Sequence, residues 1–579
     1  MRWIFDSVIV PAKYILIVPQ KDRVFELRKK VDDFRERFVV DLLTEIHVNA
    51  IEGKVMDELI DSSLKKRLPL GKPCMKGTRS AILTTIENEV KSVDGHNMIW
   101  IRGSPGVGKS ALAASILTRL QDQKRRVISF RFDRTQSTTI TTDALWRVVA
   151  CDLARLYPSF HQYLVKHDQW RSSPGINRLF ENLVEKPLSS LGDVPGEELP
   201  VIVIDALDEC GGLRHDSNEQ DDYSGLLRTL KRWVQIDCLK KFKLVITSRP
   251  ENRITQNFPH SVSIHDIPSG NDIRPGDSAS NDIRAFLESK FNEMGMEPTW
   301  IAKALDYLTP RAAGIFIWAT TVAGFLEPDP EPRFGILEAR WRGDDEEGTD
   351  DLYSLYSTVV RTSLEKVSRQ EIGGITSVMG AMIFAKEPLS DDALIVLPGV
   401  KSRNILRYIR SGLKSVIDTG SILHFHHRSF EDFLLSLFFE QELWMLSAVQ
   451  DRERHEHQLA VMCLNTMGSS TLHFNICGLK TSDIRNRDIL ATDTSAISPL
   501  LSYSCRFWAD HLVRTPCEKT LVEVVRFVMY EKLLFWMEVM SISGRIYEAT
   551  PILKKALAWP KLKVCCSLAC HGTYLMSAG

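Results

Sequence analysis

One glycine-rich segment of the sequence has the residue types and spacing that bind a phosphate chain. It reads GSPGVGKS and satisfies the pattern G-x-x-x-x-G-K-[ST]. Glycines let the main chain wrap around phosphates, and the N–H groups that begin a helix attract anions. Lys109 would reach the β- and γ-phosphates, and the Ser110 hydroxyl would ligate Mg²⁺. The predicted phosphate-binding residues are Gly103, Ser104, Pro105, Gly106, Val107, Gly108, Lys109, Ser110 and Ala111.

A second segment, VIVIDALDEC, supplies carboxylates for a metal ion and for catalysis. Asp205 ends an apolar run, where an unpaired carboxylate is costly, and a magnesium ion held through water removes that cost. Many P-loop ATPases that hydrolyse quickly keep a glutamate at the next position, where this chain has Ala206. The base that activates water would then be Asp208 or Glu209. We therefore expect slow hydrolysis, on the order of one turnover per minute or less, against ~1–100 s⁻¹ for kinases.

An arginine follows a further apolar run in FKLVITSRP. If that run is a core strand, Arg249 emerges at the same sheet edge as the phosphates, where its guanidinium suits a bidentate contact with the γ-phosphate. The alternative for this residue is an ordinary surface ion pair. In the first interpretation, Arg249 distinguishes a nucleoside triphosphate from a diphosphate.

The elements that must position these residues are strands that alternate with helices. Between Asn97 and Ile267 the apolar runs MIWIRG, RVISFRF, PVIVIDA and FKLVITS are separated by helical patterns. This alternation predicts an α/β core in which helices bury both faces of a parallel sheet. The polar and acidic segment GGLRHDSNEQDDY, residues 211–223, is expected to be an exposed loop.

The pattern after residue 266 is mostly helical. Between Glu371 and Leu435, three helical segments precede short strands around SVID and ILHFHH and then a further helix, an order typical of a winged helix. The predicted domains are an N-terminal helical connector (1–75), the nucleotide-binding core (76–266), a helical domain (267–360), a winged-helix domain (361–445) and a C-terminal helical region (446–579).

Composition argues against several classes of protein. The chain has 579 residues and a formal net charge of −1, so no overall charge attracts it to nucleic acid or to an anionic membrane. The apolar N-terminal stretch is broken by Pro11 and Pro19, which argues against a membrane span or a signal peptide. Eleven cysteines without framework spacing indicate reduced thiols in the cytoplasm. The cluster VCCSLACHG near the C-terminus lacks the paired spacing of zinc ligands.

Taken together, these segments resemble the NACHT-type P-loop domain of the STAND class of signal-transduction NTPases. The small residue after the magnesium aspartate, the acids beyond it and the strand that ends in T-S-R match that pattern. CMKGTRSAIL and the glycine-rich loop are similar to the nephrocystin 3-like N-terminal NTPase domain of fungal NLR-like proteins. AAGIFIWAT resembles the helix after the core, but Gly314 is followed by Ile315 and Phe316 where related families often have Gly-x-Pro against the adenine.

The segment FHHRSFEDFLLS resembles the end of the winged helix in these proteins. The resemblance implies that His427 contacts the β-phosphate of bound ADP and latches a closed state. It also implies that the chain binds ATP or ADP with Mg²⁺, with GTP as the alternative nucleotide. The resemblance further implies that the chain forms a homo-oligomer on activation. An upstream ligand would activate it and a downstream effector protein would receive the signal, and the sequence identifies neither.

The predicted function is a cytoplasmic signalling switch of NLR-like innate immunity or self/non-self recognition. It would hydrolyse nucleotide slowly and cycle between a closed ADP-bound state and an open, assembling ATP-bound state. Two alternatives remain: a continuously cycling mechanical ATPase of AAA+ type, and a truncated scaffold that binds nucleotide without hydrolysing it. Neither a nucleic-acid partner nor a membrane span is expected.

Overall fold

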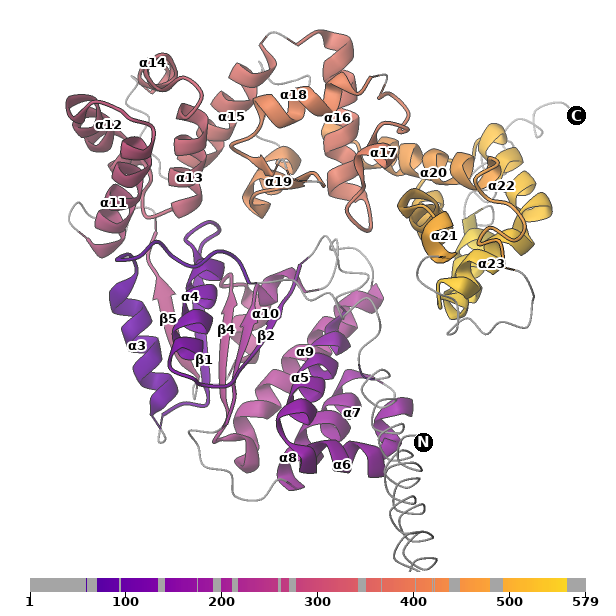
Figure 1. Cartoon of the computed structure of the whole chain (residues 1–579), viewed down its shortest axis with the longest axis horizontal. Coiled ribbons are helices and arrows are strands. Elements are labelled where there is room, and N and C mark those ends of the chain that lie inside the picture. The colour runs from indigo at the N-terminus through magenta and orange to yellow at the C-terminus, as the bar shows by residue number, and fades with distance from the viewer. Residues whose placement is uncertain are drawn as a thin grey trace, which may run out of the picture. The chain divides into compact units, whose positions relative to one another are not determined.

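The computed structural model describes most of the chain after residue 70 (Figure 1). The described residues are 59, 70–92, 95–133, 141–173, 175–190, 199–210, 217–258, 262–269, 277–341, 350–365, 367–400, 402–418, 420, 422–436, 448–479 and 493–559. The chain divides into two compact units, one of Met1–Arg67 and Asp143–Asp193 and one of Leu68–Thr142 and Val194–Gly579. The predicted N-terminal connector lies almost wholly outside the described residues, as does the cysteine cluster near the C-terminus.

The described part of the first unit is helical. Its elements are α5 Thr142–Leu156, α6 Pro158–Lys166, the 3-10 helix η2 Asp168–Ser172, α7 Ile176–Phe180, the π-helical turn η3 Glu181–Glu185 and α8 Lys186–Ser190. The rings of Trp146 and Phe180 lie 4.6 Å apart in its core. The Trp170 indole is buried and donates a hydrogen bond to the carbonyl of Leu164 over 3.2 Å. Buried aromatic side chains therefore hold this unit together.

The second unit is built on a parallel sheet of five strands. The strands are β1 Met98–Gly103, β2 Val127–Arg131, β3 Val201–Asp205, β4 Lys243–Ser248 and β5 Ser263–Ile267, in the order β2-β3-β4-β1-β5. All four neighbouring pairs are parallel. The predicted fold class is confirmed, and the four apolar runs are its first four strands. Because the strands are parallel, the residues that follow β1, β3 and β4 meet at one edge of the sheet.

Helices pack against this sheet. Its helices are α3 Ser80–Lys91, α4 Lys109–Asp122, α9 Ser217–Gln235 and α10 Asn252–Asn257. The apolar cluster that α3 and α4 form with the strands contains Leu83, Ile86, Ile99, Ile101, Leu112, Ile116, Val203 and Val245. Trp100, between Ile99 and Ile101 in the strand, packs instead against Phe258 at the end of α10, with the ring centroids 5.0 Å apart. Alternate residues of β1 are thus buried on opposite faces.

The prediction of a loop at residues 211–223 was wrong for its second half. Ser217 begins α9, so the stretch SNEQDDY is helical. Serine before acidic residues is a common start of a helix, because acidic side chains near the N-terminus interact favourably with the helix dipole. Tyr223, at the end of this stretch, is buried.

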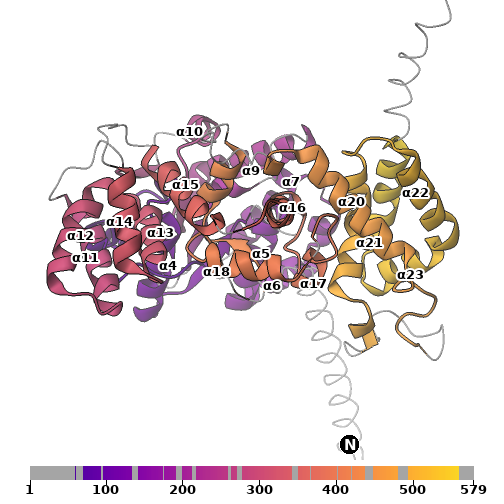
Figure 2. The same ribbon diagram turned by 90° about the horizontal axis from the view of Figure 1, so that it is seen from above.

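Helices follow the sheet, and Figures 1 and 2 show the first of them side by side. They are α11 Ser278–Glu293, α12 Pro298–Arg311, α13 Phe316–Leu326, α14 Pro330–Arg340 and α15 Asp350–Leu364. A second group near the C-terminus contains α20 Arg452–Gly468, α21 Pro499–Leu512, α22 Lys519–Glu531 and α23 Leu533–Ile542. One continuous apolar cluster extends from α11 to these last helices.

Between the two groups the elements follow the order expected of a winged helix. They are α16 Arg369–Phe384, α17 Asp391–Leu394, α18 Asn404–Gly412, the antiparallel strands β6 Ile417–Asp418 and β7 His424–Phe425, and α19 Arg428–Leu435. A capping box of Ser368 and Glu371 begins α16. Among the helices in the described ranges, none has the length and apolar character needed to cross a bilayer.

Candidate functional site

The glycine-rich segment forms a turn between β1 and α4. β1 ends at Gly103 and α4 begins at Lys109. Gly106 and Gly108 have φ angles of 81° and 96°, in the left-handed region that favours glycine. A Cβ atom on Gly106 would collide with Ile317 of α13. The two glycines let the loop turn sharply before α4, and the N-terminus of a helix is a position that favours an anion.

Lys109 lies inside this turn. Its Nζ donates hydrogen bonds to the carbonyl oxygens of Gly103 and Ser104, each over 2.9 Å. Burial lowers the pKa of Lys109 to about 8, although Asp208 and other acids nearby act to raise it. An ammonium group that is withdrawn from water and surrounded by loop carbonyls gains a strong partner when a phosphate enters.

Asp205 is fully buried at the carboxyl end of β3. Its Oδ1 accepts a hydrogen bond of 2.6 Å from the hydroxyl of Thr247 in β4, and that hydroxyl accepts one of 3.0 Å from the N–H of Ala206. Ala206 has a φ of 57°, which is uncommon for an alanine. Thr247 therefore holds both the acid and the turn that follows it.

The second carboxylate oxygen of Asp205 fits a metal ion. Oδ2 is buried and has no hydrogen-bond partner among the described residues. The Nε of Arg131, at the end of β2, lies 3.8 Å away. A buried carboxylate oxygen with unmet valence suits Mg²⁺, which binds through one or two carboxylates or hydroxyls and otherwise keeps water. Ser110, in the first turn of α4, is the other residue that would hold the ion, whose charge would neutralise that of the phosphates.

The two predicted catalytic acids differ in their surroundings. Asp208 is almost buried, and its Oδ1 accepts a hydrogen bond of 3.0 Å from the N–H of Arg249. Its Oδ2 lies 3.3 Å from Nε of Arg249 and 3.6 Å from Nη1 of Arg428. Burial, together with the charges of Asp208 and Asp133, raises the pKa of Glu209 to about 7. Asp208 is therefore a partner of arginines, whereas Glu209 has the pKa of a general base near neutral pH.

Arg249 joins the core to the winged helix. Its Nη1 donates a hydrogen bond of 3.0 Å to Oδ2 of Asp432 in α19, while its Nε faces Asp208. Arg428, also in α19, lies between the same two acids, 3.9 Å from Asp432. Burial acts to lower the pKa of Arg249, but Asp432 and Asp208 outweigh it and raise the pKa. We call Asp208, Arg249, Arg428 and Asp432 the ionic cluster.

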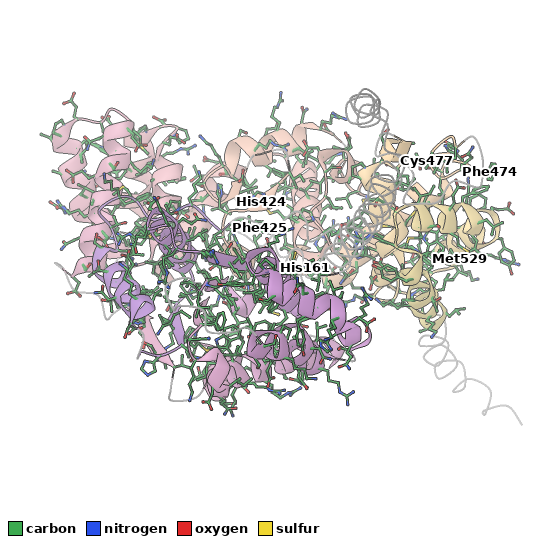
Figure 3. All side chains as sticks on the ribbon, turned by 60° about the horizontal axis from the view of Figure 1, so that its bottom comes forward. His161, His424, Phe425, Phe474, Cys477 and Met529 are labelled. Atoms are coloured by element: carbon green, nitrogen blue, oxygen red, sulfur yellow. The ribbon has the colours of Figure 1, made fainter. Side chains whose placement is uncertain are left out.

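His427 caps α19, where the charges of Arg249 and Lys109 act on its ring. Its Nδ1 accepts a hydrogen bond of 3.1 Å from the N–H of Ser429. Withdrawal from water and the charges of Arg249 and Lys109 lower the pKa of His427 to about 3. The ring is therefore neutral, and because Nδ1 is an acceptor the proton is on Nε2. The preceding strand β7 contains His424 and Phe425 (Figure 3), and His424 is exposed and lies 3.3 Å from Asp418.

The helical domain contacts the phosphate loop through the main chain. The N–H of Ile317 donates a hydrogen bond of 2.9 Å to the carbonyl of Gly106. Arg79 donates one of 3.0 Å to the carbonyl of Val107, and its guanidinium lies 5.0 Å from the ring centre of Phe316. The segment AAGIFIWAT, which departs from Gly-x-Pro, thus packs on the loop.

The structure brings most of the predicted residues together at one edge of the sheet. Sequence reasoning missed Arg79, Arg131, Thr247, Arg428 and Asp432. Thr247 and Arg428 lie inside motifs that can be recognised in the sequence. Thr247 is the threonine of T-S-R, and Arg428 directly follows His427. For Arg131 and Asp432 the only signal was a charged residue at the end of an apolar run or inside an amphipathic helix.

Comparison with known proteins agrees with the class that this fold and site define, a P-loop NTPase. Residues 77–249 match the family described as Nephrocystin 3, N-terminal. Residues 77–249 are thus similar to the NTPase domain of that family. The chain is 24% identical over 537 residues to the vegetative incompatibility protein HET-E-1 of Podospora anserina, across 85% of this chain and 37% of that protein. The chain thus spans little more than a third of that relative's length.

Two solved structures align with large parts of the chain at low TM-scores. A STAND protein with a tetratricopeptide repeat sensor from Pyrococcus horikoshii aligns with 85% of this chain and 65% of its own, at 15% identity and a TM-score of 0.36. AMPPCP-bound DnaA from Aquifex aeolicus aligns with 66% of this chain and 96% of its own, at 12% identity and a TM-score of 0.26.

Proposed function

We propose that this chain is a nucleotide-dependent signalling switch whose closed state the ionic cluster holds. The observation that carries the proposal is the position of Arg249. Its guanidinium is shared between Asp208 of the core and Asp432 of the winged helix. Arginine binds phosphate and carboxylate with the same geometry. A γ-phosphate next to Arg249 would therefore compete with Asp432 for one guanidinium, and a diphosphate would not.

His427 supports the same proposal from the other side of the site. With its proton on Nε2, the neutral ring can donate a hydrogen bond to a phosphate oxygen. The His427 ring can make this hydrogen bond while uncharged, which suits a position near several cations. His427, at the N-terminus of α19, would thus donate to the β-phosphate, which ADP and ATP share. Asp432 of the same helix would compete with the γ-phosphate, which only ATP has, for the guanidinium of Arg249. A ligand that differs in its contacts with two states shifts the balance between them.

Slow hydrolysis fits the acids of this site. The Ala206 methyl group cannot accept a proton from water, and Asp208 is engaged by two arginines. We assign the base to Glu209, whose pKa of about 7 suits that role. The proposed nucleotides are ATP and ADP with Mg²⁺, and the proposed compartment is the cytoplasm. By similarity to HET-E-1, we extend the proposal to self/non-self recognition and to assembly into a homo-oligomer.

The substitution Asp432→Asn tests the switch. It removes the charge that ties α19 to Arg249 but leaves Asp208 in place. We expect the equilibrium to shift toward the open state by about 1–3 kcal/mol, roughly 5- to 150-fold. Light scattering in ADP and in a non-hydrolysable ATP analogue measures the assembled fraction, which should rise in the variant.

The matched control is Asp391→Asn. Asp391 forms a two-fold hydrogen-bonded pair with Arg410 within the winged helix, at 2.8 and 2.9 Å. Its loss removes an equivalent ion pair without touching the core. If the Asp432 and Asp391 variants assemble to the same extent as the unmodified chain, the ionic cluster does not hold the closed state.

A further inference from the structure

Arg131 lies beside the carboxylate that would hold the metal. β2 and β3 pair in parallel, with Arg131 opposite Asp205. The N–H of Phe132 donates a hydrogen bond of 3.0 Å to the carbonyl of Asp205 and fixes this register. The Arg131 side chain therefore starts at the same height in the sheet as the acid, at the edge where the phosphate loop ends.

The side-chain geometry makes Arg131 a counter-ion of one particular oxygen. Its Nε lies 3.8 Å from Oδ2 of Asp205, close enough for charge attraction and too far for a hydrogen bond. Oδ1 is already engaged by Thr247. Oδ2 is thus the oxygen free for a metal, and it is also the oxygen that Arg131 faces. Two cations compete for one buried position.

Arg131 is also able to move away. Its side chain is 31% exposed, whereas that of Asp205 is fully buried. Its strand β2 is at the edge of the sheet, with one neighbouring strand. The Nε is buried and has no hydrogen-bond partner among the described residues, so no such bond holds that atom in place. A charged group with few restraints can turn toward solvent when another cation takes its place.

We propose that Arg131 is the resident counter-ion of Asp205 and competes with Mg²⁺ for it. This inference rests on the proposed function and adds a regulatory residue to the same site. When no metal is bound, Arg131 neutralises the charge of Asp205. A bound nucleoside diphosphate is then not repelled by an unpaired carboxylate. The closed state therefore retains its diphosphate without divalent metal. Removing the charge of Arg131 makes binding depend on Mg²⁺.

The test measures ADP affinity of the full chain in EDTA and in Mg²⁺. In the unmodified chain the two dissociation constants should agree within about threefold, because a counter-ion is present in both conditions. In Arg131→Gln the affinity in EDTA should fall by about tenfold or more, and Mg²⁺ should restore it. Arg131→Lys keeps a positive charge, so its ADP affinity in EDTA should lie between those of the unmodified chain and Arg131→Gln.

Arg102→Gln is the matched control. Arg102 of β1 stands opposite Asp266 of β5 in the same parallel register and pairs with it, but Asp266 is largely exposed and holds no metal in the proposal. This variant should keep the Mg²⁺ response of the unmodified chain. Melting temperatures without nucleotide show whether each variant is folded.

Two results would overturn the inference. If Arg131→Gln weakens ADP equally in EDTA and in Mg²⁺, Arg131 binds phosphate and does not compete with the metal. If its two constants match those of the unmodified chain, Arg131 has no role in the site. Failure of the proposed function gives a different result, because the unmodified chain then binds no more ADP than Lys109→Ala in either condition.

Discussion

At the scale of single residues, two neighbouring acids have separate roles because different groups surround them. Asp208 accepts a hydrogen bond from the N–H of Arg249, forms an ion pair with the Arg249 side chain and lies near Arg428. These contacts engage both carboxylate oxygens of Asp208 with arginine groups. Burial and the charge of Asp208 itself raise the pKa of Glu209 to about 7. The carboxylate that holds the arginines thus helps to give its neighbour the raised pKa on which the proposed role as a base rests.

Glu209→Gln should slow hydrolysis by about 10²-fold and leave ADP binding unchanged, since a general base contributes roughly 10²–10⁴-fold. In the unmodified chain, turnover should rise as the pH passes upward through about 7, because the ionised form of Glu209 accepts the proton. Single-turnover hydrolysis measured from pH 5.5 to 8.5 checks both statements. A pH profile that is the same in the variant and in the unmodified chain would show that another group is the base.

At the scale of elements, adjacent strands position the acids by hydrogen bonds between their side chains. Thr247 of β4 donates to Asp205 and accepts from the N–H of Ala206, so one hydroxyl joins the ends of two strands. The turn after β3 holds an alanine at a φ of 57°. The hydroxyl stabilises that conformation, which is uncommon without glycine or asparagine.

Thr247→Val should lower the stability of the sheet by about 1–3 kcal/mol, because it leaves a buried N–H and a buried carboxylate oxygen without their partner. A thermal melt of the nucleotide-free chain measures the loss. The control is Thr376→Val in α16, a buried hydroxyl that donates only to the carbonyl of Gly373 within its own helix. Equal melting temperatures for the two variants would contradict the role of Thr247.

The first four strands could be predicted because each lies in an apolar run of the sequence. The fifth strand, β5, could not, because its sequence SIHDI is not an apolar run and its side chains are mostly not buried. The start of α9 could not be predicted from hydrophobicity, since Ser217 and the acids after it have the composition of a loop. The contact of Arg249 with Asp432 joins residues 183 positions apart. No local pattern contains such a contact, because it depends on how the winged helix packs against the core.

At the scale of the whole molecule, the core meets the helical parts in two kinds of contact. The N–H of Ile317 in α13 donates a hydrogen bond to the carbonyl of Gly106, and both of these main-chain groups are uncharged. The ionic cluster joins α19 to Arg249 through charged groups, and in the proposed switch a γ-phosphate would change their charge balance. We therefore expect the contact of α13 with the phosphate loop to persist in both nucleotides and the contact of α19 with Arg249 to change between them.

Hydrogen–deuterium exchange of the peptide that contains α19, Arg428–Leu435, tests this central claim most directly. The full chain is compared in saturating ADP and in a saturating, non-hydrolysable ATP analogue. The account predicts slow exchange in ADP and clearly faster exchange in the analogue, because the γ-phosphate releases Asp432 from Arg249. Equal protection of this peptide in the two nucleotides would contradict it.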